Sequence, residues 1–214
     1  MHFLVRLKKN NNREWFEENR PEFEAAKENH LDFVQRMIAE LGKINPALKG
    51  QSPKDCIFRI YRDVRFSKNK APYKLNFGAY FCEGGKKSEK AGFYVQVQPG
   101  GNSFAAGGCW MPQPPQLKAI RQEIRYHTDE FKDIILARSF KKYFNGLSGD
   151  ALKTVPKGFS KDDPDIELYK FTSYIADHPF KDKEVVSKNF VKENIAVYKS
   201  IFPMLSFLNR AMGT

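Results

Sequence analysis

Two segments of alternating side chains and a third strand-like segment after them, separated by glycine-containing connections, constrain the fold of this 214-residue chain more than any other feature. In residues 76–82 and 93–98 apolar side chains occupy every second position, which is typical of strands with one buried face. The connections 83–92 and 99–102 are too short to hold the crossover that parallel strands need. Together with residues 103–110, these segments predict an antiparallel meander.

A further strand is expected at Cys56–Ser67, because its apolar and polar side chains also alternate. The apolar row, expected to face the core, is Phe58, Ile60, Val64 and Phe66. Arg62 is the exception, since it places a cation in that row. A buried cation needs a partner, so we expect either a carboxylate from a covering helix or cation–π stacking on Trp15.

Helical periodicity dominates both ends of the chain. After a proline at the expected first turn, apolar residues recur every three or four positions and predict a helix that ends near Gly42. A second long helix is expected from about Ser187, and Leu168–Ile175 is expected to form a fifth, edge-type strand. The fold class predicted is α+β: an antiparallel meander sheet of four to five strands packed with helices from both termini. No linker or repeat divides the sequence, which predicts a single domain over residues 1–214.

Composition limits the classes of partner. The formal net charge of +11 favours anionic partners, but the basic residues are scattered along the sequence. Three cysteines, Cys56, Cys82 and Cys109, form no metal-type pair and are expected to be buried free thiols. Because no apolar run approaches the roughly 20 residues that cross a bilayer, and the start is too short for a signal peptide, a cytoplasmic protein without membrane contact is expected.

Polar groups converge at one place in the predicted sheet. Arginine recognises phosphate and carboxylate in a bidentate manner, so a strand that displays arginine, tyrosine and aspartate predicts an anion site. The candidate ligand-binding residues are Arg59, Tyr61, Asp63 and Arg65 on this strand, Lys68, Lys70, Tyr73 and Lys74 in the loop after it, and Tyr94 and Gln96 on a neighbouring strand. The alternatives are a cross-strand ion-pair ladder and a solvated lysine turn. The histidines show no metal spacing and no phosphate-binding glycine motif is present, so neither a metal nor a cofactor is expected.

Three motifs resemble a bacterial family catalogued as domain of unknown function 2461. They are Asn-Asn-Asn-Arg-Glu-Trp-Phe at residues 10–16, Phe-Arg-Ile-Tyr-Arg-Asp-Val-Arg-Phe-Ser-Lys at 58–68, and Pro-Tyr-Lys at 72–74. The resemblance continues through Gly107-Gly108, residues 117–124 and residues 152–164. It implies one intact domain, and it implies no activity, cofactor or catalytic residue.

Three functions follow from the residues. The first is binding of a phosphorylated or carboxylated small ligand, including a nucleotide, on the polar sheet face. The second is a module for single-stranded nucleic acid, with Tyr61, Tyr80 and Tyr94 as stacking platforms. The third is an enzyme acting on a phosphorylated substrate, with Asp63 as general base beside Arg59 and Arg65. Two neighbouring cations would depress the pKa of that base, which makes the enzyme the weakest of the three.

Overall fold

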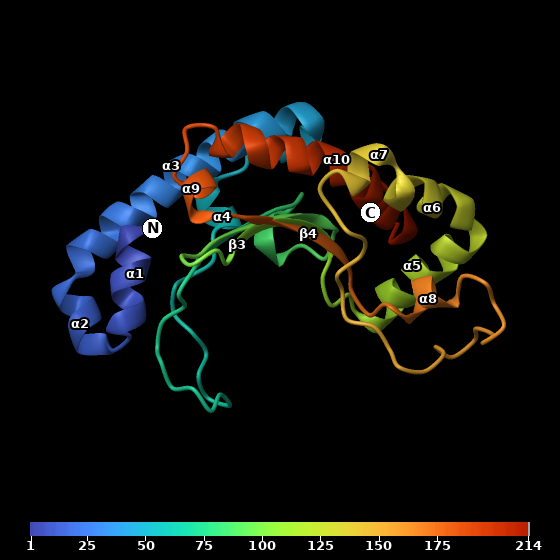
Figure 1. Ribbon diagram of the computed structural model, residues 1–214, viewed down its shortest axis with the longest axis horizontal. Helices are drawn as coiled ribbons and strands as arrows, with labels where there is room; N and C mark the ends of the chain where they lie inside the picture. Colours follow the sequence, from blue (N-terminus) through green and yellow to red (C-terminus); the bar gives the residue numbers. More distant parts are fainter. Residues whose placement is uncertain (214) are drawn as a thin grey trace. The chain divides into compact units, whose positions relative to one another are not determined.

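The computed structural model describes residues 1–213 and shows an α+β fold (Figure 1). Within these residues a four-stranded antiparallel sheet has its strands in chain order, β1-β2-β3-β4. The strands are β1 (Phe77–Phe81), β2 (Gly92–Val97), β3 (Ser103–Cys109) and β4 (Tyr174–Phe180). The predicted meander and fold class are therefore confirmed, with four strands.

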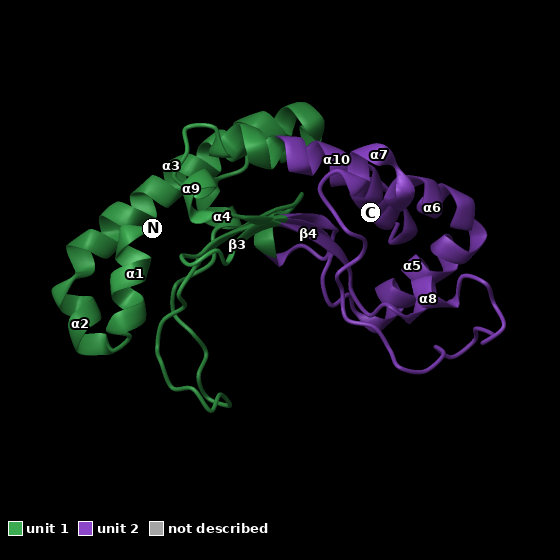
Figure 2. Cartoon of the chain, viewed as in Figure 1, with its two compact units in different colours: residues 1–86, 94–105, 179–195 green, residues 87–93, 106–178, 196–214 purple. Residues whose placement is uncertain are grey.

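The chain divides into two compact units (Figure 2). Unit 1 comprises residues 1–86, 94–105 and 179–195, and unit 2 comprises residues 87–93, 106–178 and 196–213. Strands β2, β3 and β4 have residues in both units.

Unit 1 is built on the amino-terminal helices. The helices are α1 (His2–Lys9), α2 (Arg13–Glu18), α3 (Arg20–Ile44), α4 (Pro53–Cys56), α9 (Asp182–Val185) and the first turns of α10 (Phe190–Ala211), with short 3-10 turns at Pro46–Leu48 and Gly85–Lys87. The asparagine run separates α1 from α2, since the Asn12 side chain caps α2 by accepting a hydrogen bond from the Trp15 amide at 2.9 Å. Phe3, Phe16 and Phe23 meet in an aromatic cluster that anchors α1 and α2 against α3.

Helix α3 covers β1 with its apolar stripe. The ring of Phe77 on β1 stacks on that of His30 at 5.2 Å and on that of Phe23 at 6.4 Å. His30 is buried, and its Nε2 has no hydrogen-bond partner. The helical periodicity predicted these inward positions, because residues three and four apart share one face of a helix.

Acid should weaken unit 1 through His30. Burial lowers the pKa of this imidazole to about 4 from an ordinary value of 6.5. As the pH falls, His30 therefore binds a proton at a higher pH in the unfolded chain than in the folded chain. Stability present above pH 6.5 is lost as the pH falls to about 4. We expect urea titrations at about pH 7 and about pH 4 to show that acid lowers the free energy of unfolding in both proteins. The decrease should be about 3 kcal/mol larger in the wild type than in His30→Leu. Equal losses in both proteins would contradict this account.

Unit 2 places the rest of α10 against the sheet. The rings of Tyr198 and Phe202 lie 4.8 and 6.3 Å from that of Phe93 on β2. A Cβ at Gly107 on β3 would lie 2.9 Å from Ile201, so the missing side chain permits this close approach. The remaining helices of the unit are α5 (Pro114–Tyr126), α6 (Thr128–Leu136), α7 (Arg138–Lys141) and α8 (Ile166–Lys170).

The fifth strand was predicted in the wrong place. Ile166–Lys170 forms helix α8, and the edge strand β4 begins at Tyr174. Ser173 lies between the helix and the strand, and its hydroxyl accepts a hydrogen bond from the Met111 amide at 2.9 Å. This bond joins residues 62 positions apart, so local sequence does not reveal it.

Two expectations from composition can be compared with the structure directly. Cys56, Cys82 and Cys109 are buried thiols, as predicted. Among the helices described in residues 1–213, none combines the length and apolar character that crossing a membrane requires. Over the same residues, the His, Cys, Asp and Glu side chains form no group that could hold a metal ion.

Candidate functional site

Residues 57–74 form an irregular projecting segment of unit 1, which we call the arm (Figure 1). Of two isolated antiparallel bridges, one pairs Ile57 with Ala79 on β1, and the other pairs Tyr61 with Tyr73 within the arm. Three residues lie between Ile57 and Tyr61, whereas five lie between Tyr73 and Ala79. The ladder is therefore interrupted by a bulge. The strand predicted at Cys56–Ser67 is therefore wrong, although part of the segment is extended and paired.

The expected alternation of side chains fails along the arm. Ile60 is buried, Phe58 is 37% exposed and Phe66 is 96% exposed. The chain leaves its partner after Arg62 and turns, with the Ser67 amide donating to the Val64 carbonyl at 3.3 Å. Since a turn resets the direction of successive side chains, the apolar row could not remain on one face.

Arg62 links the two sides of the arm next to the Tyr61–Tyr73 bridge, a place that we call the neck of the arm. Its guanidinium donates to the Ala71 carbonyl at 3.0 Å and to the Ser67 hydroxyl at 3.3 Å. These are neutral partners within the arm, so the predicted partners, a helix carboxylate or Trp15, were wrong. The cation above Trp15 is that of Arg6, 5.4 Å from the ring centroid.

Asp63 and Arg65 pair with each other at the surface. Nε and Nη2 of Arg65 donate to the two carboxylate oxygens at 3.0 and 2.7 Å. Hydrogen bonds from Arg65 lower the pKa of Asp63, and the charge of Arg59 adds to the effect. The pair lies within one segment, so it is not a cross-strand ladder, and a carboxylate held in this way is a weak general base.

The lysines of the arm have different environments. Nζ of Lys70 donates to the carbonyls of Val64 and Arg65 at 3.0 and 3.4 Å. Lys68 is exposed, whereas Lys74 is partly buried with its Nζ 5.5 Å from the Phe58 ring centroid. Burial first, and then the charge of Arg59, lowers the pKa of Lys74.

Tyr94 and Gln96 lie on β2, away from the charged arm tip. The Tyr94 hydroxyl donates to Oε1 of Gln96 at 3.2 Å, and Nε2 of Gln96 donates to Oε1 of Gln98 at 3.1 Å. The Tyr94 ring contacts the rings of Phe58 and Phe104, and burial raises the pKa of its hydroxyl to about 12. These polar groups bond to each other within the sheet face.

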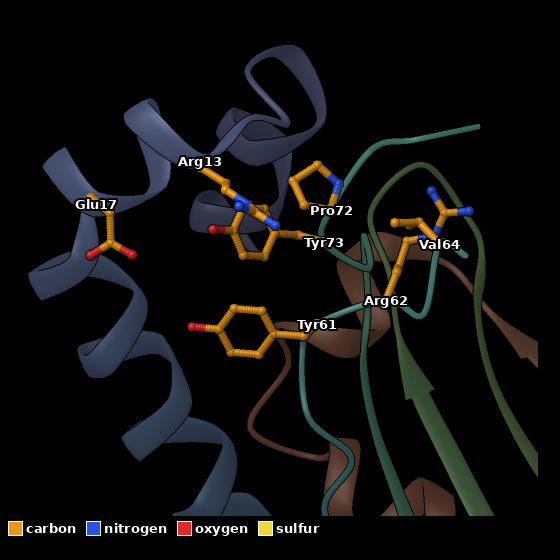
Figure 3. A pocket seen from close by; sticks show the side chains of 7 residues that line it. All are labelled: Arg13, Glu17, Tyr61, Arg62, Val64, Pro72 and Tyr73. Carbon is orange, nitrogen blue, oxygen red and sulfur yellow. The ribbon is translucent and has the colours of Figure 1, made fainter. Parts of the chain in front are cut away.

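A pocket of about 330 Å³ lies between α2 and the arm, entirely within unit 1. We call it the tyrosine pocket; Arg13, Glu17, Tyr61, Arg62, Val64, Pro72 and Tyr73 line it. Figure 3 shows the Tyr61 and Tyr73 hydroxyls pointing to the same side, while the Arg62 guanidinium points away from both rings. Two predicted residues, Tyr61 and Tyr73, therefore meet in one pocket.

Tyr73 forms the floor of the tyrosine pocket. This residue is 3% exposed, and its ring stacks on that of Phe16 at 3.9 Å with an interplanar angle of 13°. Asn11 fixes the backbone of Tyr73, because its side chain donates to the carbonyl at 3.0 Å and accepts from the amide at 3.1 Å. The Tyr61 ring lies 5.4 Å from that of Tyr73 and is the more exposed of the two.

The charges around the pocket are unequally paired. Glu17 accepts two hydrogen bonds from Arg20, at 2.9 and 2.7 Å, and this contact lowers the pKa of the Glu17 carboxyl. Arg20 also hydrogen-bonds to Tyr61, and its pKa is raised by Glu17 first and then by Tyr61. Within residues 1–213, the Arg13 guanidinium has neither a hydrogen-bond nor an ion-pair partner, and Figure 3 shows Arg13 and Tyr73 lining the same pocket. Arg13 therefore brings to the pocket a positive charge that no described carboxylate pairs with.

Sequence reasoning missed Arg13 and Glu17. Their spacing of four residues on α2 was a usable signal, because residues at i and i+4 share one helix face. What the spacing does not reveal is that this face meets Tyr61 and Tyr73, which are more than 40 positions away.

The fold and the pocket define an α+β protein whose amino-terminal unit carries an aromatic, arginine-bearing site. The chain belongs to the family described as "Conserved hypothetical protein (DUF2461)", whose model matches residues 1–207. The three motifs at residues 10–16, 58–68 and 72–74 each contribute lining residues to the tyrosine pocket. No curated protein and no solved structure matches the chain.

Proposed function

We propose that this protein binds a small anionic ligand, a phosphate or carboxylate compound, in the tyrosine pocket. The observation that carries the proposal is the Arg13 guanidinium, which has no partner among residues 1–213 and lines the same pocket as the buried Tyr73. A planar guanidinium binds the oxygens of phosphate and carboxylate bidentately. An anion at this position would meet Arg13 and the tyrosine hydroxyls together.

The surrounding groups support an anion rather than a cation. Glu17 is already bound to Arg20, so its charge is compensated before a ligand arrives. The Tyr61 and Tyr73 hydroxyls can each donate one hydrogen bond to a ligand oxygen.

The size of the pocket restricts the ligand. A volume of about 330 Å³ is at the lower end of the roughly 300 to 1,000 Å³ typical of ligand pockets. The tyrosine rings supply flat apolar walls, which suit a ring or short carbon chain attached to the anionic group. Mononucleotides, sugar phosphates and small dicarboxylates are therefore the compounds to test first.

Thermal denaturation with these compounds tests the proposal. A ligand present at about 100 times its Kd stabilises the folded state by about 2.7 kcal/mol, which corresponds to a rise in Tm of roughly 5 to 10 °C for a chain of this size. We expect Arg13→Gln to lose most of this rise. Tyr61→Phe and Tyr73→Phe, which each remove one hydroxyl, should weaken binding about three- to tenfold.

The matched control is Arg36→Gln on α3, which removes an equally exposed arginine outside the pocket. This variant should keep the full rise in Tm. If no compound raises the Tm of the wild type, or if Arg13→Gln responds as strongly as Arg36→Gln, the proposal is wrong.

A further inference from the structure

The tip of the arm presents an aromatic ring to solvent. Phe66 is 96% exposed, the highest exposure among the large apolar side chains described. Phe66 does not line the tyrosine pocket, so the ring has no role in the function proposed above. Leaving a phenylalanine ring in water forgoes the stabilisation that burial gives, which makes this position a candidate contact surface.

The tip holds Phe66 in place through its own hydrogen bonds. Lys70 bridges the carbonyls of Val64 and Arg65, and the Ala71 amide donates to the Asn69 side chain at 2.9 Å. Together with the bonds of Arg62 across the neck, these contacts order the loop around Phe66. An ordered loop loses little conformational entropy when it binds a partner.

A cation lies near the Phe66 ring. The Arg65 guanidinium lies 5.8 Å from the ring centroid, and Asp63 fixes this guanidinium through two hydrogen bonds. The ring itself is nearly fully exposed, which leaves space for a second flat group to stack on it. Every nucleobase has such a π-face, and stacking on an aromatic side chain tolerates any sequence.

The charge of the arm indicates a polyanion. Residues 59–74 contain six basic residues and a single acidic one. These residues are Arg59, Arg62, Arg65, Lys68, Lys70 and Lys74 against Asp63. Cations interleaved with an exposed aromatic ring match a strand that alternates phosphates with bases.

We propose that the arm binds single-stranded nucleic acid, with a base stacked on Phe66 and phosphates held by Arg59 and Lys68. A single strand is required because the bases of a duplex stack on each other. An anionic membrane fits less well, since Phe66 is flanked by the charged Arg65 and the polar Ser67, and one aromatic side chain anchors a protein weakly. This surface differs from the tyrosine set Tyr61, Tyr80 and Tyr94 that the sequence indicated.

Fluorescence anisotropy with two strands separates stacking from charge. One strand is labelled oligothymidine of about 20 nucleotides, and the other is an abasic strand of equal length and charge, both in about 50 mM salt. We expect the wild type to prefer the strand with bases, and Phe66→Ala to bind that strand about tenfold more weakly, equivalent to about 1.4 kcal/mol. The variant should bind the abasic strand as the wild type does, and Phe66→Trp should restore the preference.

Two controls complete the design. Tyr126→Ala removes a similarly exposed ring from unit 2 and should leave both affinities unchanged. Lys68→Ala should weaken binding to both strands and reduce the slope of log K against log salt by about 0.7.

Three results would overturn the proposal. The first is no binding of either strand at low salt. The second is equal affinity of wild type and Phe66→Ala for oligothymidine. The third is binding to phosphatidylserine vesicles that depends on Phe66 while the strands do not bind, which would identify a membrane surface instead.

Discussion

Phe16→Ala is expected to lower the free energy of unfolding by about 3 to 5 kcal/mol, the range for deleting a fully buried phenylalanine ring. Phe16 is 0% exposed and lies between the rings of Phe23 and Tyr73, at 4.9 and 3.9 Å. Its loss would leave a cavity that the neighbouring rings, held from α3 and the arm, can fill only partly. Urea denaturation followed by far-ultraviolet circular dichroism measures the change.

Phe66→Ala is the matched control, because it removes the same ring from a position that is 96% exposed. We expect a change within about 0.5 kcal/mol, as for ordinary surface substitutions. The alternation of the sequence assigned Phe66 to the core, and the structure assigns it to solvent. A large loss of stability in Phe66→Ala would favour the sequence assignment and contradict the structure of the arm tip.

The regular elements of the fold were predictable, because their signals are local. The alternation in residues 76–82 and 93–98 predicted β1 and β2, the turn before residues 103–110 predicted β3, and the helical stripe predicted α3. Each of these elements buries a face whose period matches its backbone geometry. The side-chain pattern fails to predict the backbone only where tertiary contacts determine its course.

The arm shows such a failure. Its alternating side chains resemble those of a strand, but the bridges at Ile57 and Tyr61 are out of register by two residues, and Pro72 has no amide to donate. Asn11 then holds Tyr73 through two hydrogen bonds across 62 positions. Neither the bulge nor this long-range contact has a local signature, so Tyr73 was expected in an exposed loop and is buried.

Some of the residues that line the tyrosine pocket were predicted as site residues, whereas the place where they meet was not. Arginine and tyrosine side chains at Arg59, Tyr61 and Tyr73 indicated an anion site, and the structure gathers two of these residues in the tyrosine pocket. The partners from α2 depend on how that helix packs against the arm. Charge and residue type can be read from a sequence, whereas the meeting of distant segments requires the fold.

Gly108→Ala is expected to cost more than about 4 kcal/mol, which would leave little folded protein. Gly108 is the last residue but one of β3, next to β4, and a Cβ there would lie 2.0 Å from the Tyr174 carbonyl oxygen and 2.8 Å from the Ile175 Cα. These are backbone atoms of a paired strand, so they cannot move without breaking the sheet. Its φ of 132° adds strain for any residue with a side chain.

Gly101→Ala is the control that separates the steric clash expected at Gly108 from the cost of a positive φ. Gly101 also has a positive φ, 73°, but a Cβ there would meet no atom within 4 Å. We expect this variant to lose only about 1 kcal/mol, the cost of the left-handed conformation in a residue with a Cβ. Soluble yield and thermal denaturation of the two variants make the comparison. If Gly108→Ala were no less stable than Gly101→Ala, strands β3 and β4 could not lie as close together as the structure places them.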